Sequence, residues 1–182
     1  MNIKYFKIFI LLTVLIIAST GAVYKVDIDK VAIITQFGKV IGSPREPGLH
    51  FKVPFIQKEH HYAVRRIYQW SGKIFKVKTL DNKDIQVSPN VNWRINDATR
   101  FYLEVKYLES SITRLEDLLS STIANSLCFY KLSEIENNHF KKTEDGIFLS
   151  PEINDDIMDQ CRARFSKYGM EIFTLEIQIK AF

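Results

Sequence analysis

Hydrophobic and polar positions form three successive kinds of pattern along the chain. An uncharged stretch of seventeen residues, Ile8–Tyr24, lies between Lys7 and Lys25. From about residue 31 to residue 95, apolar residues alternate with polar ones in short runs, which is typical of strands with one buried face. From Asn96 onwards, apolar residues recur every three or four positions, which predicts amphipathic helices, and a last alternating run follows. The pattern therefore predicts an α+β fold with a β-meander followed by helices packed on the sheet.

The first stretch has two interpretations. As a helix it is roughly 26 Å long, slightly short of a ~30 Å hydrocarbon core, and the lysines at both ends can extend to the interface. The alternative is a secretory signal peptide, because the densest apolar part, Ile8–Ala18, has only eleven residues and follows a basic start. The small-residue cleavage pattern is poor, which favours a retained transmembrane anchor. Either interpretation carries the rest of the chain across a membrane.

The alternating region is expected to hold several short strands. Val31–Val40 is β-rich and is interrupted by Gly38, as a turn or bulge would interrupt it. Pro47-Gly48 suits the centre of a type II turn, where proline presets φ and glycine accepts a positive φ. Further strands are predicted at residues 62–70, 73–79 and 84–95, with a turn at 80–83 and with Pro89 indicating a bulge or an edge position.

The run Leu49–Phe55 carries a sharper prediction. Its apolar residues alternate strictly with His50 and Lys52, so we expect a strand with a buried apolar face and a solvent-exposed polar face. Pro54 cannot donate a hydrogen bond to a neighbouring strand, and it therefore marks the end of this strand or an edge position.

The second half predicts helices and one closing strand. Asn96-Asp97 can cap a short helix through Tyr102, and residues 110–127 form an amphipathic helix with Ile112 on its apolar stripe. A polar loop is expected at 133–149. Ser150 and Pro151 then begin a helix that Gly169 ends, and an alternating strand over residues 173–179 closes the chain.

Charge is distributed unevenly. Residues 1–25 contain three lysines and no acid, residues 26–78 contain ten basic and four acidic side chains, and residues 79–182 contain twelve basic and seventeen acidic ones. The basic pI of about 9.0 therefore arises near the predicted anchor, where a basic surface suits anionic lipid. Ordinary chance asymmetry explains the gradient equally well. No basic helix or aromatic-basic platform indicates nucleic-acid binding.

The flanks of the anchor predict its orientation. Met1, Lys4 and Lys7 precede it without any acid, so the positive-inside rule places the N-terminus in the cytoplasm and the domain on the outer face of the membrane. Cys128 and Cys161 would then lie outside. A disulfide is possible there, but two buried free thiols on helix faces fit the pattern better.

Candidates for chemistry are few. His60 and His61 are adjacent and would point to opposite faces of a strand, and His50 and His139 lie in separate polar positions. No nucleophile motif, zinc motif, phosphate-binding loop or dinucleotide fingerprint is present. We therefore expect no enzyme activity, no catalytic residues, no metal and no cofactor.

The order of these features resembles the stomatin/prohibitin/flotillin/HflK-HflC (SPFH, band-7) family over about residues 23–182, with the HflC branch the most similar. The segments concerned are VDIDKVAIITQFGKV, PGLHFKVPFI, VNWRIND and GMEIFTLEIQIKAF. The residues that carry the resemblance are Phe37, Gly38, Pro47, Gly48, His50, Phe51, Pro54, Phe55, Trp93, Arg94 and Gly169. They are expected to have structural roles.

The resemblance implies an uncleaved single-pass anchor in the bacterial inner membrane and a non-catalytic scaffold. It implies a hetero-oligomer with an HflK-like subunit, which encloses an FtsH-like AAA+ protease and restricts substrate access, beside membrane lipid. A stomatin-like organiser of lipid without a protease partner is the alternative. The expected organisation is a cytoplasmic N-terminus at 1–7, an anchor at 8–24, and a band-7 domain at 25–182, divided into a membrane-proximal β-rich part (25–95) and an α/β part (96–182). The long helix and coiled coil that follow in the family are not among these 182 residues, so we expect a fragment or a shortened member.

Overall fold

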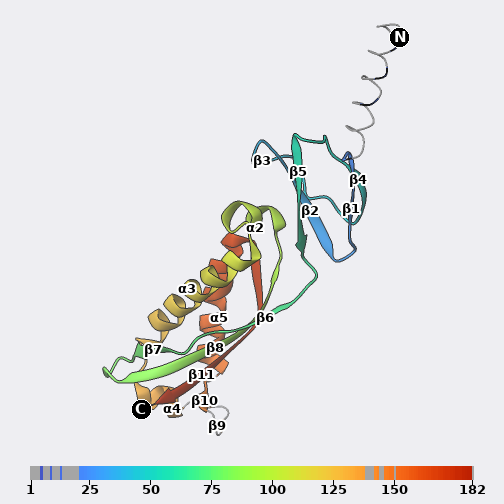
Figure 1. The fold of residues 1–182 in the computed structure, drawn as a ribbon. Coiled ribbons are helices and arrows are strands. Elements are labelled where there is room, and N and C mark those ends of the chain that lie inside the picture. The colour runs from blue at the N-terminus through green and yellow to red at the C-terminus, as the bar shows by residue number, and fades with distance from the viewer. Residues whose placement is uncertain are drawn as a thin grey trace. The chain divides into compact units, whose positions relative to one another are not determined.

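The structure is a computed structural model and describes residues 5, 9, 13, 21–137, 142–143, 146–149 and 151–181 (Figure 1). Contacts divide the chain into two compact units, Met1–Arg65 and Arg66–Phe182. The predicted anchor, Ile8–Tyr24, falls mostly outside the described residues. Within the described part, no helix is both long enough and apolar enough to cross a membrane.

The first unit consists of two small antiparallel sheets. One sheet pairs β1 (Val23–Val26) with β4 (Gly48–Phe51). The other has the strand order β3-β2-β5, with β2 at Lys30–Gln36, β3 at Lys39–Val40 and β5 at Gln57–Ala63. A small core of buried side chains lies between them, made of Tyr24, Val26, Ala32 and Ile34, with Ile41 packed against it.

The turn at Phe37-Gly38 confirms the predicted interruption of the first strand. Phe37 has φ 50° and Gly38 has φ 80°, and Gln36 pairs with Lys39 across the two-residue loop. Two positive φ angles are what a type I′ hairpin requires. The type II turn predicted at Pro47-Gly48 is wrong, because Gly48 is the first residue of β4 and has φ 141°, far from the roughly +80° of that turn.

The second unit is built on a six-stranded antiparallel sheet with the order β6-β8-β11-β10-β9, and β7 also pairs with β8. The strands are β6 (Tyr68–Ser71), β7 (Phe75–Lys78), β8 (Asp84–Ile95), β9 (Lys142–Thr143), β10 (Gly146–Phe148) and β11 (Met170–Ala181). The long β8 and β11 pair from Ile85–Ala181 to Ile95–Met170. This pairing makes β8 part of the same unit as the end of the chain. The boundary between the two units therefore lies at residue 65, whereas the sequence pattern changes from strand-like to helix-like at residue 95.

The helices pack on one face of this sheet (Figure 1). They are α2 (Ala98–Glu104), α3 (Leu108–Leu127), α4 (Leu132–Asn137) and α5 (Pro151–Phe165), and the 3₁₀ turn η1 (Ser166–Tyr168) follows α5. The predicted stripes of α3 and α5 are confirmed, with Leu115, Leu119, Ile157 and Phe165 fully buried. Ile112 is an exception, because it is 44% exposed.

Pro89 lies in the middle of β8, a strand with neighbours on both sides. It is tolerated because β6 ends at Ser71 and β7 begins only at Phe75, so no strand faces Pro89 across this gap. The N–H of Gly72 donates to the Pro89 carbonyl at 2.8 Å. Pro89 therefore occupies an edge position only at this point of β8, where no neighbouring strand would accept a hydrogen bond from residue 89.

Other sequence predictions need correction. The strand expected at 62–70 is divided between β5 and β6, and the loop expected at 133–149 contains α4 and the β9–β10 hairpin. Ser150, the predicted cap of α5, lies outside the described residues. Both cysteines are free, but only Cys161 is buried, whereas Cys128 is exposed because it is the C-cap of α3 and no longer on the helix's packed stripe.

Candidate interaction surfaces

Two of the histidines, His50 and His61, lie against the buried Tyr24 in the first unit. The Tyr24 ring lies 5.7 Å from the His50 ring and 6.2 Å from the His61 ring, centre to centre. His60 points elsewhere, with its Nε2 3.2 Å from Thr35 Oγ1, as expected for neighbouring residues of one strand. His139 lies outside the described residues. Within the described residues, no group of three or more His, Cys, Asp or Glu is arranged to hold a metal ion.

Two charged side chains flank the same tyrosine. Lys52 donates to Glu59, and its Nζ lies 6.0 Å from the centre of the Tyr24 ring. Burial raises the pKa of Glu59, but the hydrogen bond and charge of Lys52 outweigh it, and the pKa lies below its ordinary value. Burial raises the pKa of Tyr24, and Arg45 opposes this in part. The Tyr24 hydroxyl is buried without a hydrogen-bond partner. This cluster is part of the packing between the two sheets.

Exposed apolar side chains gather at one end of the first unit. We call this set the apolar end; its members are Val23, Phe37, Phe51, Val53, Phe55 and Ile56. Phe37 is 82% exposed and Phe55 is 87% exposed. Phe55 has a positive φ of 64°, which is uncommon for a bulky residue. A patch of this kind is typical of a protein or membrane contact site.

Strand pairing and a hydrogen bond between two side chains bring these residues together. Val23 pairs directly with Phe51 across β1 and β4, so the two side chains share a face. The Gln57 amide donates to the Gln36 side chain at 3.2 Å, which joins the turn at Phe37 to the turn that ends at Ile56. The apolar end therefore comes from three separate parts of the chain.

Gly21 and Ala22, where the continuously described residues begin, lie at the same place. A Cβ added to Gly21 would be 3.7 Å from Pro54 Cβ, and the Lys52 N–H donates to the Ala22 carbonyl at 2.7 Å. Gly21 and Ala22, near the end of the predicted anchor, thus lie beside the turn that presents Val53 and Phe55. The last two residues of the predicted anchor, Val23 and Tyr24, belong to β1 instead.

The predicted strand Leu49–Phe55 is wrong in two respects. The strand β4 ends at Phe51, and its apolar face is the exposed one, with Leu49 66% exposed and Phe51 75% exposed. The face with His50 and Lys52 packs around Tyr24 instead. Alternation shows which residues share a face, but not which face meets the core. Here the His50 side of the strand faces the buried Tyr24 ring.

The remaining family residues lie in the second unit. Trp93 is buried in β8 and stacks on Tyr68 with 4.9 Å between ring centres. Arg94, on the other face, donates to Glu171 at 2.8 Å and lies over the Phe173 ring at 4.7 Å. Phe173 is the extra residue of a bulge where the β8–β11 register shifts.

Gly169 closes the turn after α5. Its φ is 70°, and its carbonyl accepts from the N–H groups of Asn96 and Asp97 at 2.9 and 3.1 Å. Asp97 in turn caps α2 through hydrogen bonds to Thr99 and Arg100. The eleven family residues therefore do not form one site: eight belong to the first unit, and Trp93, Arg94 and Gly169 hold the second unit together.

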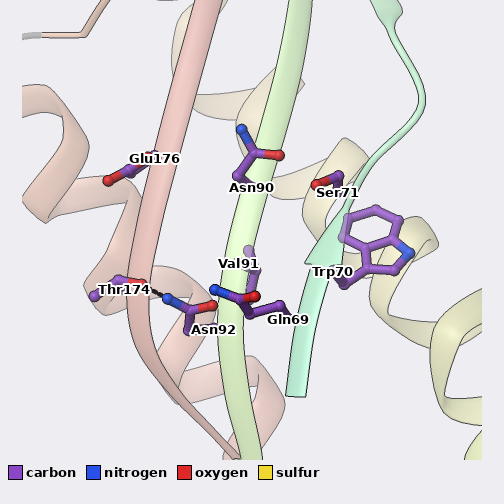
Figure 2. Close-up of a pocket in the computed structure, with 8 residues that line it drawn as sticks. All are labelled: Gln69, Trp70, Ser71, Asn90, Val91, Asn92, Thr174 and Glu176. Carbon is purple, nitrogen blue, oxygen red and sulfur yellow. Dashed lines mark hydrogen bonds between the residues drawn. The ribbon is translucent and has the colours of Figure 1, made fainter. Parts of the chain in front are cut away.

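A concave surface lies on the sheet face opposite the helices. It is a cleft of about 350 Å³ lined by Gln69, Trp70, Ser71, Asn90, Val91, Asn92, Thr174 and Glu176 (Figure 2). The Asn92 amide donates to Thr174 Oγ1 at 2.8 Å across β8 and β11. A smaller cleft of about 110 Å³ continues along the same strands at Gln86, Ser88 and Gln178.

Sequence reasoning missed this cleft. The signal was present in the even positions of β8, where Gln86, Ser88, Asn90 and Asn92 alternate with buried residues. Only the pairing with β6 and β11, which are distant in sequence, shows that polar uncharged side chains cover a continuous area.

Comparisons with known proteins assign almost all of the described chain to a protein family. A profile described as SPFH domain / Band 7 family matches residues 24–181. Protein HflC of Treponema pallidum (strain Nichols) is 27% identical over 124 residues, which is 64% of this chain and 37% of that protein. Protein HflC of Borreliella burgdorferi is 24% identical over 152 residues, 81% of this chain and 46% of that protein. The Modulator of FtsH protease HflC of Escherichia coli (strain K12) is 34% identical over 88 residues, 45% of this chain and 26% of that protein.

These alignments are partial on both sides. The matched part covers less than half of the length of each of these three curated relatives.

Proposed function

Because the chain belongs to the SPFH domain / Band 7 family, we propose that it is a membrane-anchored, HflC-like scaffold that acts by assembly and not by catalysis. It forms a hetero-oligomer with an HflK-like subunit and restricts the access of substrates to an FtsH-like membrane protease. The name of the Escherichia coli relative, Modulator of FtsH protease HflC, supports this role.

The observation that carries the proposal is the apolar end beside Gly21. A domain that restricts access to a membrane protease has to lie against the bilayer. Phe37 and Phe55 lie in turns at the end of the unit where the predicted anchor joins. Lys39 is exposed two residues after Phe37, and Lys25 is exposed two residues after Val23 on β1. Aromatic tips with lysines around them are typical of side chains at a membrane interface.

The binding free energy expected for the apolar end on lipid indicates its role. Burying a phenylalanine side chain is worth about 1.5–3 kcal/mol, and each lysine near anionic lipid adds about 1 kcal/mol. The sum is comparable to a single acyl chain, which binds membranes only marginally. The apolar end therefore orients the first unit on the lipid, and the N-terminal apolar stretch supplies the anchor.

The proposed location is the inner membrane of a bacterium, with the N-terminus in the cytoplasm and the domain on the periplasmic face. The uncompensated charges of Lys4 and Lys7 support this orientation.

A stomatin-like organiser of membrane lipid is the second candidate, because the apolar end favours lipid contact with or without a protease partner. Purification of the native membrane complex separates the two. We expect an HflK-like subunit and an FtsH-like protease to migrate with the chain. Migration of the chain without either protein would leave only the lipid-organising role.

A further inference from the structure

Exposed lysines lie beside the apolar end in each of the three parts of the chain that form it. In each part, an exposed apolar residue is followed two positions later by an exposed lysine; the pairs are Val23 and Lys25, Phe37 and Lys39, and Ile56 and Lys58. Two residues of chain span at most about 7 Å, and the headgroup layer on each side of a bilayer is roughly 5–8 Å thick. With the apolar side chains at the acyl boundary, the three ammonium groups therefore lie at the depth of the lipid phosphates.

These three lysines are available to an external charge. Within the described residues, the side chains of Lys25, Lys39 and Lys58 form no ion pair and no hydrogen bond. Lys52 differs from them, because it donates to Glu59 and both side chains of this pair are partly buried. The carboxylate of Glu59 is thereby neutralised within the fold.

The other acids of the first unit lie away from the apolar end; they are Asp27, Asp29 and Glu46. The first two lie between β1 and β2, whereas Lys39 pairs with the last residue of β2. The seven residues of β2 extend roughly 20 Å, which is about two Debye lengths in 0.1 M salt. Asp27 is already paired with Lys30 at 2.8 Å, and the residue before Glu46 bridges to Ala32, near the start of β2. The apolar end therefore has a positive surround.

We propose that the apolar end selects anionic phospholipid over zwitterionic lipid. This inference rests on the proposed contact between the apolar end and the bilayer, and it names the lipid class that the contact favours. Lysine binds phosphate as a point charge, without the fixed fork geometry of arginine. The three lysines therefore recognise the net negative charge of the lipid surface, and not the shape of one headgroup.

The expected selectivity follows from the number of lysines. Each lysine close to an anionic surface changes the docking equilibrium about fivefold. Three lysines then favour the docked state by roughly 100-fold on an anionic surface relative to a zwitterionic one. Because salt screens exposed charges, high salt should remove most of this preference.

The test measures docking of the apolar end in the full chain, reconstituted in nanodiscs. An NBD group on Phe55→Cys, in a Cys128→Ser background, reports contact with lipid through quenching by a zwitterionic spin-labelled lipid. Nanodiscs of phosphatidylcholine are compared with nanodiscs that also contain phosphatidylglycerol, over a range of KCl concentrations. We expect stronger quenching with phosphatidylglycerol at low salt, and a fall to the phosphatidylcholine value at high salt.

Charge-removing variants identify the groups that are responsible. On phosphatidylglycerol, Lys39→Gln should lower the ratio of docked to undocked chains about fivefold, and Lys39→Gln/Lys58→Gln about 25-fold. Neither variant should change docking on phosphatidylcholine alone. Arg65→Gln is the matched control, because it removes an exposed positive charge just after β5, at the opposite end of this strand from the apolar end. It should dock as the unaltered chain does.

The outcomes separate this inference from the proposed lipid contact. Equal quenching with and without phosphatidylglycerol would overturn the inference and leave the lipid contact standing. A preference for phosphatidylglycerol that survives in Lys39→Gln/Lys58→Gln or at high salt would also overturn it, because the lysines would not be its source. No quenching on either surface would overturn the lipid contact as well.

Discussion

Asp81 shows how one side chain can join two distant parts of the second unit. Its carboxylate accepts from Thr79 Oγ1 at 2.6 Å in the turn before β8, and from the Leu132 N–H at 3.0 Å at the start of α4. These hydrogen bonds, that from Thr79 first, lower the pKa of Asp81 from 3.8 to about 2. Because the folded pKa lies below the unfolded one, the contribution to stability is present above pH 3.8 and is lost as the pH falls towards 2.

Asp81→Asn is therefore expected to lower Tm at pH 7, and the difference from the unaltered chain should shrink as the pH approaches 2. Thermal unfolding followed by circular dichroism at several pH values measures it. Asp84→Asn, an exposed residue of the same turn region, is the control and should change Tm little. A Tm difference that stays constant from pH 7 to pH 2 would contradict the account.

The two cysteines differ in environment. Burial raises the pKa of the Cys161 thiol to about 11, so at pH 8 it is protonated and enclosed, whereas Cys128 is exposed. A membrane-impermeant maleimide should label one thiol per native chain, and Cys128→Ser should abolish that labelling. Denaturation should expose the second thiol.

The same reagent tests the proposed orientation. Applied to intact spheroplasts, it should label Cys128 without lysis. Labelling that requires lysis would place the domain in the cytoplasm.

At the scale of elements, the apolar end is the feature most open to test. A Cys128→Ser background with Phe55→Cys allows an environment-sensitive NBD group to be placed at the tip of its turn. In liposome-reconstituted full chain, we expect blue-shifted emission and quenching by spin-labelled lipid. Ile28→Cys is the matched control: Ile28 is 76% exposed, but it lies at the opposite end of β2, roughly 20 Å away.

Equal quenching at positions 55 and 28, or none at 55, would show that the apolar end does not face lipid.

Replacing Gly169 by alanine is expected to destabilise the fold in two ways, through backbone strain at a positive φ and through a steric clash of the added Cβ. Gly169→Ala places a Cβ 2.2 Å from the Asp97 carbonyl oxygen and 2.7 Å from the Phe101 nitrogen, both backbone atoms that cannot move freely. We expect a loss of about 3 kcal/mol or more in the free energy of unfolding, from strain at φ 70° plus the clash. Denaturant unfolding measures it.

Gly38→Ala is the companion variant, because its φ is 80° but nothing lies within 4 Å of the added Cβ. It should cost only about 1–2 kcal/mol. Equal losses for the two variants would show that the contact at Gly169 relaxes.

The sequence pattern correctly predicted the helices and strands that bury a single face. The stripes of α3 and α5 and the odd positions of β8 were found because each meets a single buried face. For Leu49–Phe55 the wrong face was predicted to be buried, because alternation does not show which of the two faces meets the core. The hairpin β9–β10 was missed because its strands have two and three residues, too few for any period to show.

The candidate surfaces were less predictable than the fold. The family residues Phe37 and Phe55 were identified by resemblance, but their exposure follows from turns with positive φ that alternation does not encode. The cleft lined by Gln69, Asn90 and Thr174 depends on β6, β8 and β11 lying side by side. No single run of the sequence contains that information.

At the scale of the whole molecule, a scaffold and an enzyme are expected to differ in the effect of deleting the gene. The chain combines an N-terminal apolar stretch, an apolar end where that stretch joins the first unit, and a second unit with a cleft lined mainly by polar side chains. Such a chain should alter the activity of another protein, and its own loss should remove a restraint.

The most direct test is therefore the turnover of membrane proteins degraded by the proposed partner, an FtsH-like protease, measured by pulse-chase in cells with and without this chain. We predict that deletion changes their half-lives by severalfold, that the intact gene restores them, and that a Phe37→Ser/Phe55→Ser variant restores them only in part. Unchanged half-lives, with altered lipid-domain behaviour, would contradict the protease-regulating account and support the lipid-organising one.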